Sequence, residues 1–344
     1  MVSLRDIARK ARTSIGTVDR VLHNRGRVSK EMSSKVMAIV SRHGYKPNIY
    51  ARNLSLGKTF TLGVLMPAAG QDGSYWGIPA RGIRRAEKEL RPYRVQVRVF
   101  HYDRYSDKSF WSAARRCRSS KIDGLLLAPV LQEIAAKALA DLFSGIPYVF
   151  FDSVIAGARP IATVSQDPFQ SGVLAGNLMR KLLPAGGDIA AVKVTPGDDH
   201  IEARIRGFLE SFRNDRRYAV HIHEAESRIP GLLSKTIPLR ILQRHRARCG
   251  VFVSNAWTHP LARYFLHHAG REHVHLIGYD LIPENRVCLK NGAIDFLISQ
   301  RPAMQGYDGI MALYRSIVLR EHVAPEIIVP LDIVTRESYM YYQD

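Results

Sequence analysis

The chain has 344 residues, of which 46% are hydrophobic and 24% are charged. These fractions are ordinary for a globular protein, and the length allows more than one domain. No stretch approaches the roughly 18 consecutive apolar residues of a membrane span, so we expect no membrane partner. The three cysteines, Cys117, Cys249 and Cys288, are far apart and show no metal-binding spacing. We therefore expect reduced core cysteines and no metal site.

The formal net charge is +19, and it is distributed unevenly along the chain. The first 58 residues hold 13 Lys or Arg and 3 Asp or Glu, which is more than half of the net charge. This pattern indicates a basic module joined to a more nearly balanced body, and it favours a polyanionic partner for the module. The N-terminus lacks the apolar segment of a secretory signal, so we expect a cytoplasmic, nucleoid-associated protein.

The first 46 residues are predicted to form a helix-turn-helix domain of short helices. Ser3 can cap a first helix, and Arg12 and Thr13 form a tight turn. Ser14 then caps a second helix and Ser29 a third. Two helices joined by so short a turn, with a third to support them, are typical of a helix-turn-helix module. The apolar positions with helical spacing are Ile7, Ala8, Ala11, Ile15, Val18, Val21, Leu22, Met32, Val36, Ile39 and Val40.

Residues 47–58 are predicted to form a hinge. Pro47 ends the helical unit, Asn48 can cap one short helix that ends at Leu54, and Gly57 and Lys58 act as a linker. A helix of six or seven residues is marginal alone, so we expect it to order only when two hinges pair on DNA in a homodimer.

Strand-like and helical stretches alternate from residue 59 onward, and this pattern predicts parallel sheets that helices cover on both faces. Nearly 290 residues are too many for one sheet, so we expect an effector-binding domain of two α/β lobes over 59–344. Lobe 1 is expected at about 59–160 and 301–323, and lobe 2 at about 161–300 and 324–344. The predicted strands are Leu62–Met66, Val95–Phe100, Gly124–Ala128, Tyr148–Phe151, Ile189–Val194, Val251–Val253, His275–Tyr279 and Ala293–Ile298; the clearest helices are Ile78–Leu90, Ser109–Arg118, Pro168–Leu183 and Ile201–Asn214.

The N-terminal segment carries three motifs of one known family. They are S-x-x-T-V-x-R-V-L at residues 14–22, S-K at 29–30, and Y-x-P-N followed by A-R-x-L at 45–54. On these motifs the chain closely resembles the LacI/GalR (lactose-repressor) family of transcription regulators. The resemblance implies a lambda-repressor-like helix-turn-helix followed by a periplasmic-binding-protein-like (type I) sensor of two lobes. It also implies double-stranded operator DNA and a small-molecule effector as partners.

The second helix is the predicted DNA reader. Ile15, Gly16, Thr17 and Arg20 point away from its packed apolar stripe, so they can reach base edges in the major groove. Ser14, Thr17, Asn24 and Ser29 lie at helix ends, where hydroxyls, amides and backbone N–H groups suit phosphate contacts. Capping alone is the alternative for Ser14 and Ser29, and it does not exclude a phosphate contact.

Two features complete the predicted interface. Asp19 stands where the family usually has a small hydroxyl residue; its carboxylate can accept from cytosine N4 or pair with Arg20 or Arg25. The resemblance also implies that Leu54 wedges into a base step of the minor groove, with Arg52 beside the backbone and Asn48 at the start of the hinge helix. The alternative for Leu54 is packing against its own protein.

The effector site is predicted where parallel strands end, in the cleft between the lobes. Arg204 matches the ligand-clamping arginine of the family, whereas Asn255-Ala256 replaces the family's usual Asn-Asp. Carboxylates, amides and an arginine bind adjacent hydroxyls, and aromatic side chains cover the apolar face of a sugar. We therefore expect a carbohydrate or a similar polyol as the effector. The candidate residues are Tyr75, Trp76, Pro129, Asp152, Asp167, Arg204, Asn255, Asp280 and Gln300.

Other functions receive less support from the sequence. The chain contains no P-loop, GxGxxG, GxSxG or HExxH motif, so we expect neither an enzyme nor a cofactor. The cluster His267, His268, His273 and His275 is better explained as a helix end that runs into a strand than as a metal site. Three alternatives stay open at this point: a sugar-binding transport protein, an enzyme on the same two-lobed fold, and a non-specific architectural DNA protein.

Overall fold

The computed structural model describes residues 4–22, 26, 28–43, 58–195, 199–229, 231–245, 248–268 and 273–342. The chain folds as two compact units, Met1–Lys58 and Thr59–Asp344. None of the helices in these ranges is both long enough and apolar enough to cross a bilayer. The predicted fold class, a helix-turn-helix module and a two-lobed α/β body with parallel sheets, is confirmed.

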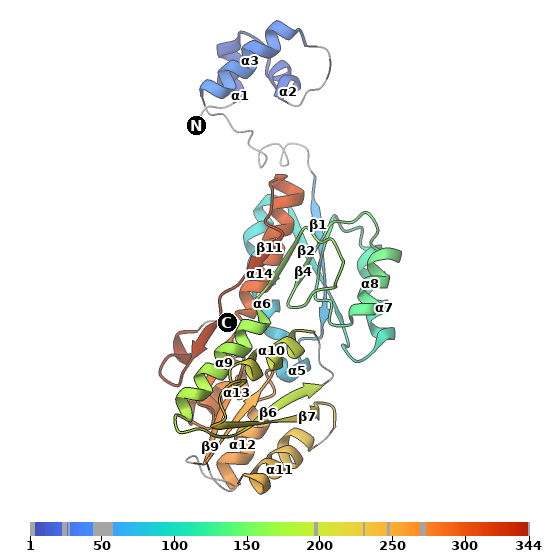
Figure 1. Cartoon of the computed structure of the whole chain (residues 1–344). Coiled ribbons are helices and arrows are strands. Elements are labelled where there is room, and N and C mark those ends of the chain that lie inside the picture. The colour runs from blue at the N-terminus through green and yellow to red at the C-terminus, as the bar shows by residue number, and fades with distance from the viewer. Residues whose placement is uncertain are drawn as a thin grey trace. The chain divides into compact units, whose positions relative to one another are not determined.

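In the described part of the N-terminal unit, three helices pack around a small apolar core (Figure 1). Helix α1 spans Leu4–Ala11, α2 spans Ile15–Leu22 and α3 spans Lys30–Arg42. Both described caps are confirmed: Ser14 Oγ accepts a hydrogen bond from Thr17 N at 3.1 Å, and Ser29 Oγ accepts one from Met32 N at 3.2 Å. The predicted cap Ser3 lies outside the described residues. The fully buried core side chains are Ile7, Ala11, Val18 and Val36.

The first lobe of the larger unit contains a parallel sheet with the order β11-β5-β4-β3-β1-β2. Helices α7 and α8 cover one face, and α6 and α14 cover the other (Figure 1). The strands are β1 Phe60–Pro67, β2 Val95–Tyr102, β3 Gly124–Leu127, β4 Tyr148–Phe151, β5 Ala162–Ser165 and β11 Glu326–Ile328. The helices are α5 Gln71–Ser74, α6 Gly77–Leu90, η1 Arg91–Tyr93, α7 Asp107–Ser119, α8 Gln132–Asp141, α14 Pro302–Leu313 and η3 Tyr314–Leu319.

The second lobe contains a sheet with the order β12-β10-β9-β8-β6-β7, in which only β12 pairs antiparallel. Helices α9 and α10 pack on one face, and α11, α12 and α13 on the other. The strands are β6 Gly187–Thr195, β7 Tyr218–Glu226, β8 Cys249–Val253, β9 Val274–Tyr279, β10 Phe296–Ser299 and β12 Asp332–Val334. The helices are α9 Pro168–Leu182, α10 Asp199–Glu210, η2 Leu232–Thr236, α11 Ile237–Arg244, α12 His259–His268, α13 Pro283–Lys290 and η4 Tyr339–Tyr341.

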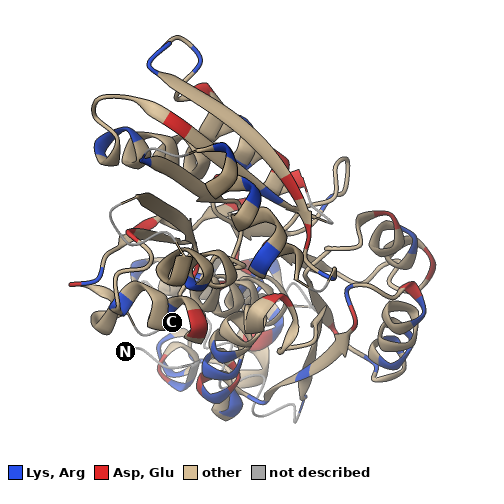
Figure 2. Cartoon of the chain, turned by 90° about the horizontal axis from the view of Figure 1, so that it is seen from below, with Lys and Arg blue, Asp and Glu red and all other residues tan. Residues whose placement is uncertain are grey.

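Hydrophobic patterning explains this layering. The central strands β3 and β8 are buried along their whole length, as expected for parallel strands that helices cover on both faces. In Figure 2 the strands are mostly tan, whereas Lys, Arg, Asp and Glu are most frequent on the helices and loops outside the sheets. The charged residues are therefore concentrated in the helices and loops around the sheets.

The chain passes between the lobes three times, and two of these passages fall later than expected. β5 pairs with β4 and β11 pairs with β5, so residues 162–165 and 326–328 belong to the first lobe rather than the second. These strands have only four and three residues, which is too short for a clear alternation pattern. At the passage from β10 to α14, Arg301 binds Asp332 through Nε at 2.6 Å and Nη2 at 2.9 Å.

Two further differences concern strand bounds. β10 begins at Phe296 and not at Ala293, because Ala293 N donates to Cys288 O in the turn that closes α13. β7 was not predicted at all. This edge strand, YAVHIHEAE, alternates apolar residues with His and Glu along a half-exposed ribbon, so it lacks the continuous apolar run of its neighbours.

Candidate functional site

A cavity lies between the two lobes, at the edge where the strands end. Its free volume is about 40 Å³, which suits a few water molecules. A ligand of monosaccharide size can therefore enter only if the lobes separate or the lining side chains move. The first lobe contributes Asp72, Tyr75, Trp76, Arg104 and Asp152, and the second contributes His200, Ile201, Arg204, Asn255, Ala256, Asp280 and Gln300.

Seven of the nine predicted effector residues line this cavity; Pro129 and Asp167 do not. Pro129 is buried just after β3. Asp167 caps α9 instead, because its Oδ1 accepts a hydrogen bond from Gln170 N at 2.9 Å. The seven residues that the fold brings together are Tyr75, Trp76, Asp152, Arg204, Asn255, Asp280 and Gln300.

The prediction missed five lining residues. Asp72 and Arg104 follow β1 and β2, so the rule about strand ends applied to them as well. His200 and Ile201 lie about one turn before Arg204 on α10, on the same side of the helix. Ala256 follows Asn255, and its apolar side chain gives no indication in the sequence of a binding role.

In the second lobe, Arg204 anchors a buried chain of hydrogen bonds. The side chain is 1% exposed. Nη1 donates to Ser254 O at 3.1 Å and Nη2 donates to Gln300 Oε1 at 2.7 Å, while Gln300 Nε2 donates to Asp280 Oδ2 at 2.9 Å. The guanidinium also stacks over the Tyr279 ring, 4.2 Å from its centre. These contacts fix a cation and a carboxylate side by side against the cavity.

Close helix packing holds Arg204 in place. An added Cβ on Gly172 of α9 would lie 2.0 Å from Arg204 O, and one on Gly207 of α10 would lie 2.0 Å from Phe169 O. Only glycine permits backbones to approach this closely, so the two helices are pressed together at the level of the arginine.

In the first lobe, Asp152 and Tyr75 form a buried pair. Tyr75 OH donates to Asp152 Oδ1 at 2.6 Å, and Ser153 Oγ donates to Oδ2 at 3.1 Å. Burial raises the pKa of Asp152 above its usual range, and it raises the pKa of Tyr75 as well. Asp152 has a φ of 68°, a conformation that few non-glycine residues adopt and one that is frequent at functional sites.

Asp72 organises the rest of this lobe's wall. Its Oδ2 accepts from Trp76 Nε1 at 2.7 Å and pairs with Arg104 Nη1 at 2.5 Å, and its Oδ1 accepts from Tyr105 OH at 3.1 Å. The side chains of Asp72 and Arg104 are 9% and 10% exposed. Asp72, Gly73 and Ser74 all have positive φ, which turns the chain sharply between β1 and α6 and aims the carboxylate inward.

Several contacts link the two lobes. Tyr105 OH lies 3.3 Å from Ser227 Oγ, and the Arg228 guanidinium lies over the Tyr105 ring at 5.1 Å. Ser153 Oγ lies 3.3 Å from His200 Nδ1. Burial, together with the charges of two nearby arginines, lowers the pKa of His200 well below its usual value, so the ring is neutral at physiological pH. The described conformation is therefore closed.

The chemistry of this wall suits hydrogen bonding to hydroxyl groups. Carboxylates and amide oxygens accept, guanidinium and amide nitrogens donate, and Trp76 supplies an apolar surface. Among the described residues, no group of three or more His, Cys, Asp or Glu side chains is arranged to hold a metal ion.

The N-terminal unit presents its predicted reading surface to solvent. Ser14, Ile15, Gly16 and Arg20 are exposed along α2, Thr17 is half-buried, and Val18 on the opposite side of the helix is fully buried. Ile15 is 43% exposed, so its side chain is available for an apolar contact. Ser29 is exposed at the start of α3. The predicted contacts Asn24, Asn48, Arg52 and Leu54 lie outside the described residues.

Comparisons with known proteins divide the chain at the same place. Residues 3–48 match the family described as bacterial regulatory proteins, lacI family, and residues 62–319 match the periplasmic binding protein domain. The HTH-type transcriptional regulator RegA of Clostridium acetobutylicum is 46% identical over 65 residues, which are 19% of this chain and 20% of RegA. The chain spans only 20% to 43% of the length of the first curated relatives that it matches.

Solved structures resemble the larger unit. A putative LacI transcriptional regulator from Bacteroides fragilis is 27% identical with a TM-score of 0.72, and the match covers 83% of this chain and all of that one, 100%. GanP, a glucose-galactose binding protein from Geobacillus stearothermophilus, is 22% identical with a TM-score of 0.69 and covers 82% of this chain and 99% of its own. At that identity, the likeness to GanP shows a shared fold.

Proposed function

Because the chain belongs to the lacI family of bacterial regulatory proteins and has a periplasmic binding protein domain as its larger unit, we propose that it is a sequence-specific DNA-binding transcription regulator. A sugar or sugar derivative in the cavity between the lobes modulates its affinity for operator DNA. The observation that carries this proposal is the presence, in one chain, of an exposed reading helix and a buried polar cavity.

Helix α2 supports the DNA-binding part of the proposal. Its exposed residues include Arg20, which can bind guanine or phosphate, and Ile15, which can contact a thymine methyl group. The unit around α2 holds most of the net charge of the chain, as binding to phosphates requires. A homodimer supplies two such helices for the two halves of a pseudo-palindromic operator, and it acts in the cytoplasm, where the chromosome is.

The polar wall of the cavity supports the effector-binding part of the proposal. The cross-lobe bonds from Tyr105 and from His200 must break before a sugar enters, and they can form again around it. A ligand that bridges Asp152 and Arg204 stabilises the closed lobes by the difference between its affinities for the two conformations. Ligand and DNA affinities are then coupled reciprocally, typically by about 1–3 kcal/mol.

A sugar-binding transport protein is the second candidate, because GanP has the same two-lobed fold. The helix-turn-helix unit favours the regulator, since a transport protein has no use for a reading helix. The assay below distinguishes the two candidates: a transport protein does not select a DNA sequence.

The proposal is tested by selecting duplexes from a random-sequence pool with the full chain at physiological salt. We expect a pseudo-palindromic sequence to be enriched. Arg20→Ala then reduces the preference for the selected sequence, by about 1–3 kcal/mol if Arg20 contacts a base. The control Lys35→Ala removes an exposed charge from α3 and weakens binding to all sequences alike. A pool with no enriched sequence, with or without sugars, would rule out the regulator.

A further inference from the structure

A second hollow on the larger unit is rich in positive charge. This α6 groove has a volume of about 730 Å³ and lies where α6 ends and β1 and β2 begin. Half of its lining side chains are cationic and one is acidic. The lining residues are Thr59, Arg84, Glu87, Lys88, Arg91, Arg94, Val95 and Gln96.

Three cations of the α6 groove, Arg84, Lys88 and Arg91, lie in a strongly basic segment of the chain. Residues 81–98 contain seven Lys or Arg and two Asp or Glu, whereas all of the chain after residue 58 has a net charge of +9. Arg84, Lys88 and Arg91 are exposed, and within the described ranges no carboxylate lies at ion-pair distance from them. Cations that repel one another at such density favour a polyanion that neutralises them.

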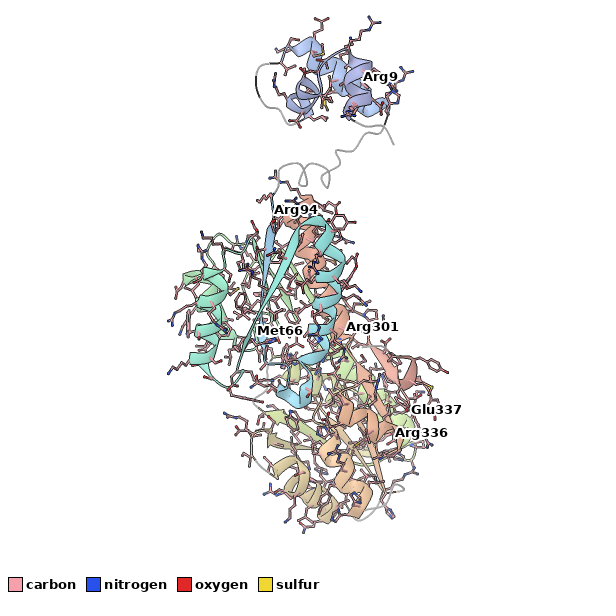
Figure 3. The ribbon with its side chains drawn as sticks, turned by 180° about the vertical axis from the view of Figure 1, so that it is seen from behind. Arg9, Met66, Arg94, Arg301, Arg336 and Glu337 are labelled. Atoms are coloured by element: carbon pink, nitrogen blue, oxygen red, sulfur yellow. The ribbon has the colours of Figure 1, made fainter. Side chains whose placement is uncertain are left out.

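The position of the groove indicates which polyanion it meets. Arg94 O accepts from Phe60 N at 3.0 Å, so the groove borders the first residues of β1. Arg94 precedes Val95, the partner of Phe60 at the start of β1, whereas Met66 lies near the other end of that strand (Figure 3). The chain enters β1 from the N-terminal unit, and Lys58 follows His43 by 15 residues. A chain of that length spans at most about 50 Å, so DNA held by the N-terminal unit is at a high effective concentration near the groove.

We propose that the α6 groove binds the phosphate backbone of the DNA that α2 reads, beside the recognised bases. Arg84, Lys88 and Arg91 are the contacts, with Arg94 at the edge of the groove. DNA suits the groove better than an acidic protein does, because a duplex carries one negative charge per about 1.7 Å and is tethered nearby by the same chain. The proposal rests on the proposed DNA-binding function and extends the DNA interface to the sensor unit.

Salt dependence of DNA binding tests the proposal. The groove variant is Arg84→Gln, Lys88→Gln and Arg91→Gln. The control variant is Arg206→Gln, Arg216→Gln and Arg240→Gln, which removes the same charge from exposed positions of the second lobe. Fluorescence anisotropy with a duplex of about 60 base pairs that carries the selected sequence at its centre, in about 50–250 mM KCl, gives the slope of log affinity against log salt. We expect the groove variant to lower the slope by about 2–3 and the control to change it little.

Acetylation of lysines provides a second measurement on the unmodified chain. We expect the duplex to protect Lys88 but not Lys235, an exposed lysine of the second lobe. Equal slopes for the two variants, or a Lys88 that acetylates equally with and without DNA, would overturn the proposal and leave the groove to another anion, such as an acidic protein surface. If the unmodified chain does not bind the duplex at all, the proposed function fails as well, so the two failures are distinguishable.

Discussion

Replacing Arg204 with alanine tests the central part of the cavity. The change removes the donors to Ser254 O and Gln300 Oε1 and the cation over Tyr279. Hydrogen bonds to a charged group contribute about 1.5–3 kcal/mol each, and the loss is reduced because a buried guanidinium no longer has to be desolvated. We expect a net loss of about 3 kcal/mol in the free energy of unfolding of the larger unit. For a domain of this size, that loss corresponds to a fall of roughly 6 °C in Tm.

The same variant separates sensing from DNA binding. Without Arg204, Gln300 loses the donor that orients it, and Gln300 in turn is the donor to Asp280. A sugar that raises the Tm of the unmodified protein therefore no longer raises that of the variant. Binding to the selected duplex persists, because the N-terminal unit folds on a core of its own.

Differential scanning fluorimetry against a panel of aldoses, ketoses and sugar acids measures both effects, and mobility shift measures DNA binding. Arg206→Ala is the matched control, since Arg206 lies on the exposed side of the same helix and its loss leaves Tm and sugar response unchanged. If Arg204→Ala has the same Tm as the unmodified protein, the buried hydrogen bonds of Arg204 add no net stability. If it also keeps the same sugar response, Arg204 is not part of the site.

Three further substitutions probe other parts of the structure. Tyr105→Phe removes the hydroxyl that links Asp72 to the second lobe. We expect the sugar affinity measured by calorimetry to fall about tenfold. An unchanged affinity would refute the role of Tyr105 in linking the lobes. Gly82→Ala places a Cβ 1.7 Å from a backbone oxygen of α14 and costs about 2–3 kcal/mol in urea unfolding, whereas Gly70→Ala, with open space around it, changes stability by less than about 0.5 kcal/mol. The pKa of His200 is lowered on folding, so the unfolded chain takes up a proton below about pH 6.5 that the folded chain does not, and stability falls as pH falls. His200→Asn should make that fall shallower by up to about 1.4 kcal/mol per pH unit, and a slope equal to that of the unmodified protein would contradict this.

Much of the cavity was predictable because one topological rule covers most of it. Asp152, Asn255, Asp280 and Gln300 each follow a buried strand whose apolar run is plain in the sequence, so their convergence follows from the parallel sheets. Asp167 also follows a strand, yet its carboxylate caps the helix that begins at the next residue. Sequence position alone does not decide between these two uses of an aspartate.

Two of the missed residues, Asp72 and Arg104, depend on local backbone geometry. Asp72 faces the cavity because it and the next two residues adopt left-handed conformations. The sequence Gln71–Ser74 does not by itself predict three consecutive residues with positive φ. The ion pair with Asp72 holds Arg104 at the cavity, so a prediction that omits Asp72 also omits Arg104. The division between the lobes was misplaced for a related reason. Strands β5 and β11 are too short to show an alternation of apolar and polar residues.

The late return of the chain to the first lobe has a consequence for synthesis on the ribosome. α14 and β11 are made after the whole second sheet except β12, although they complete the first lobe. The second lobe can therefore assemble while the first still exposes one apolar face and one unpaired strand edge, a state prone to aggregation. A nonsense codon near residue 300 would accordingly damage the lobe that was translated earliest.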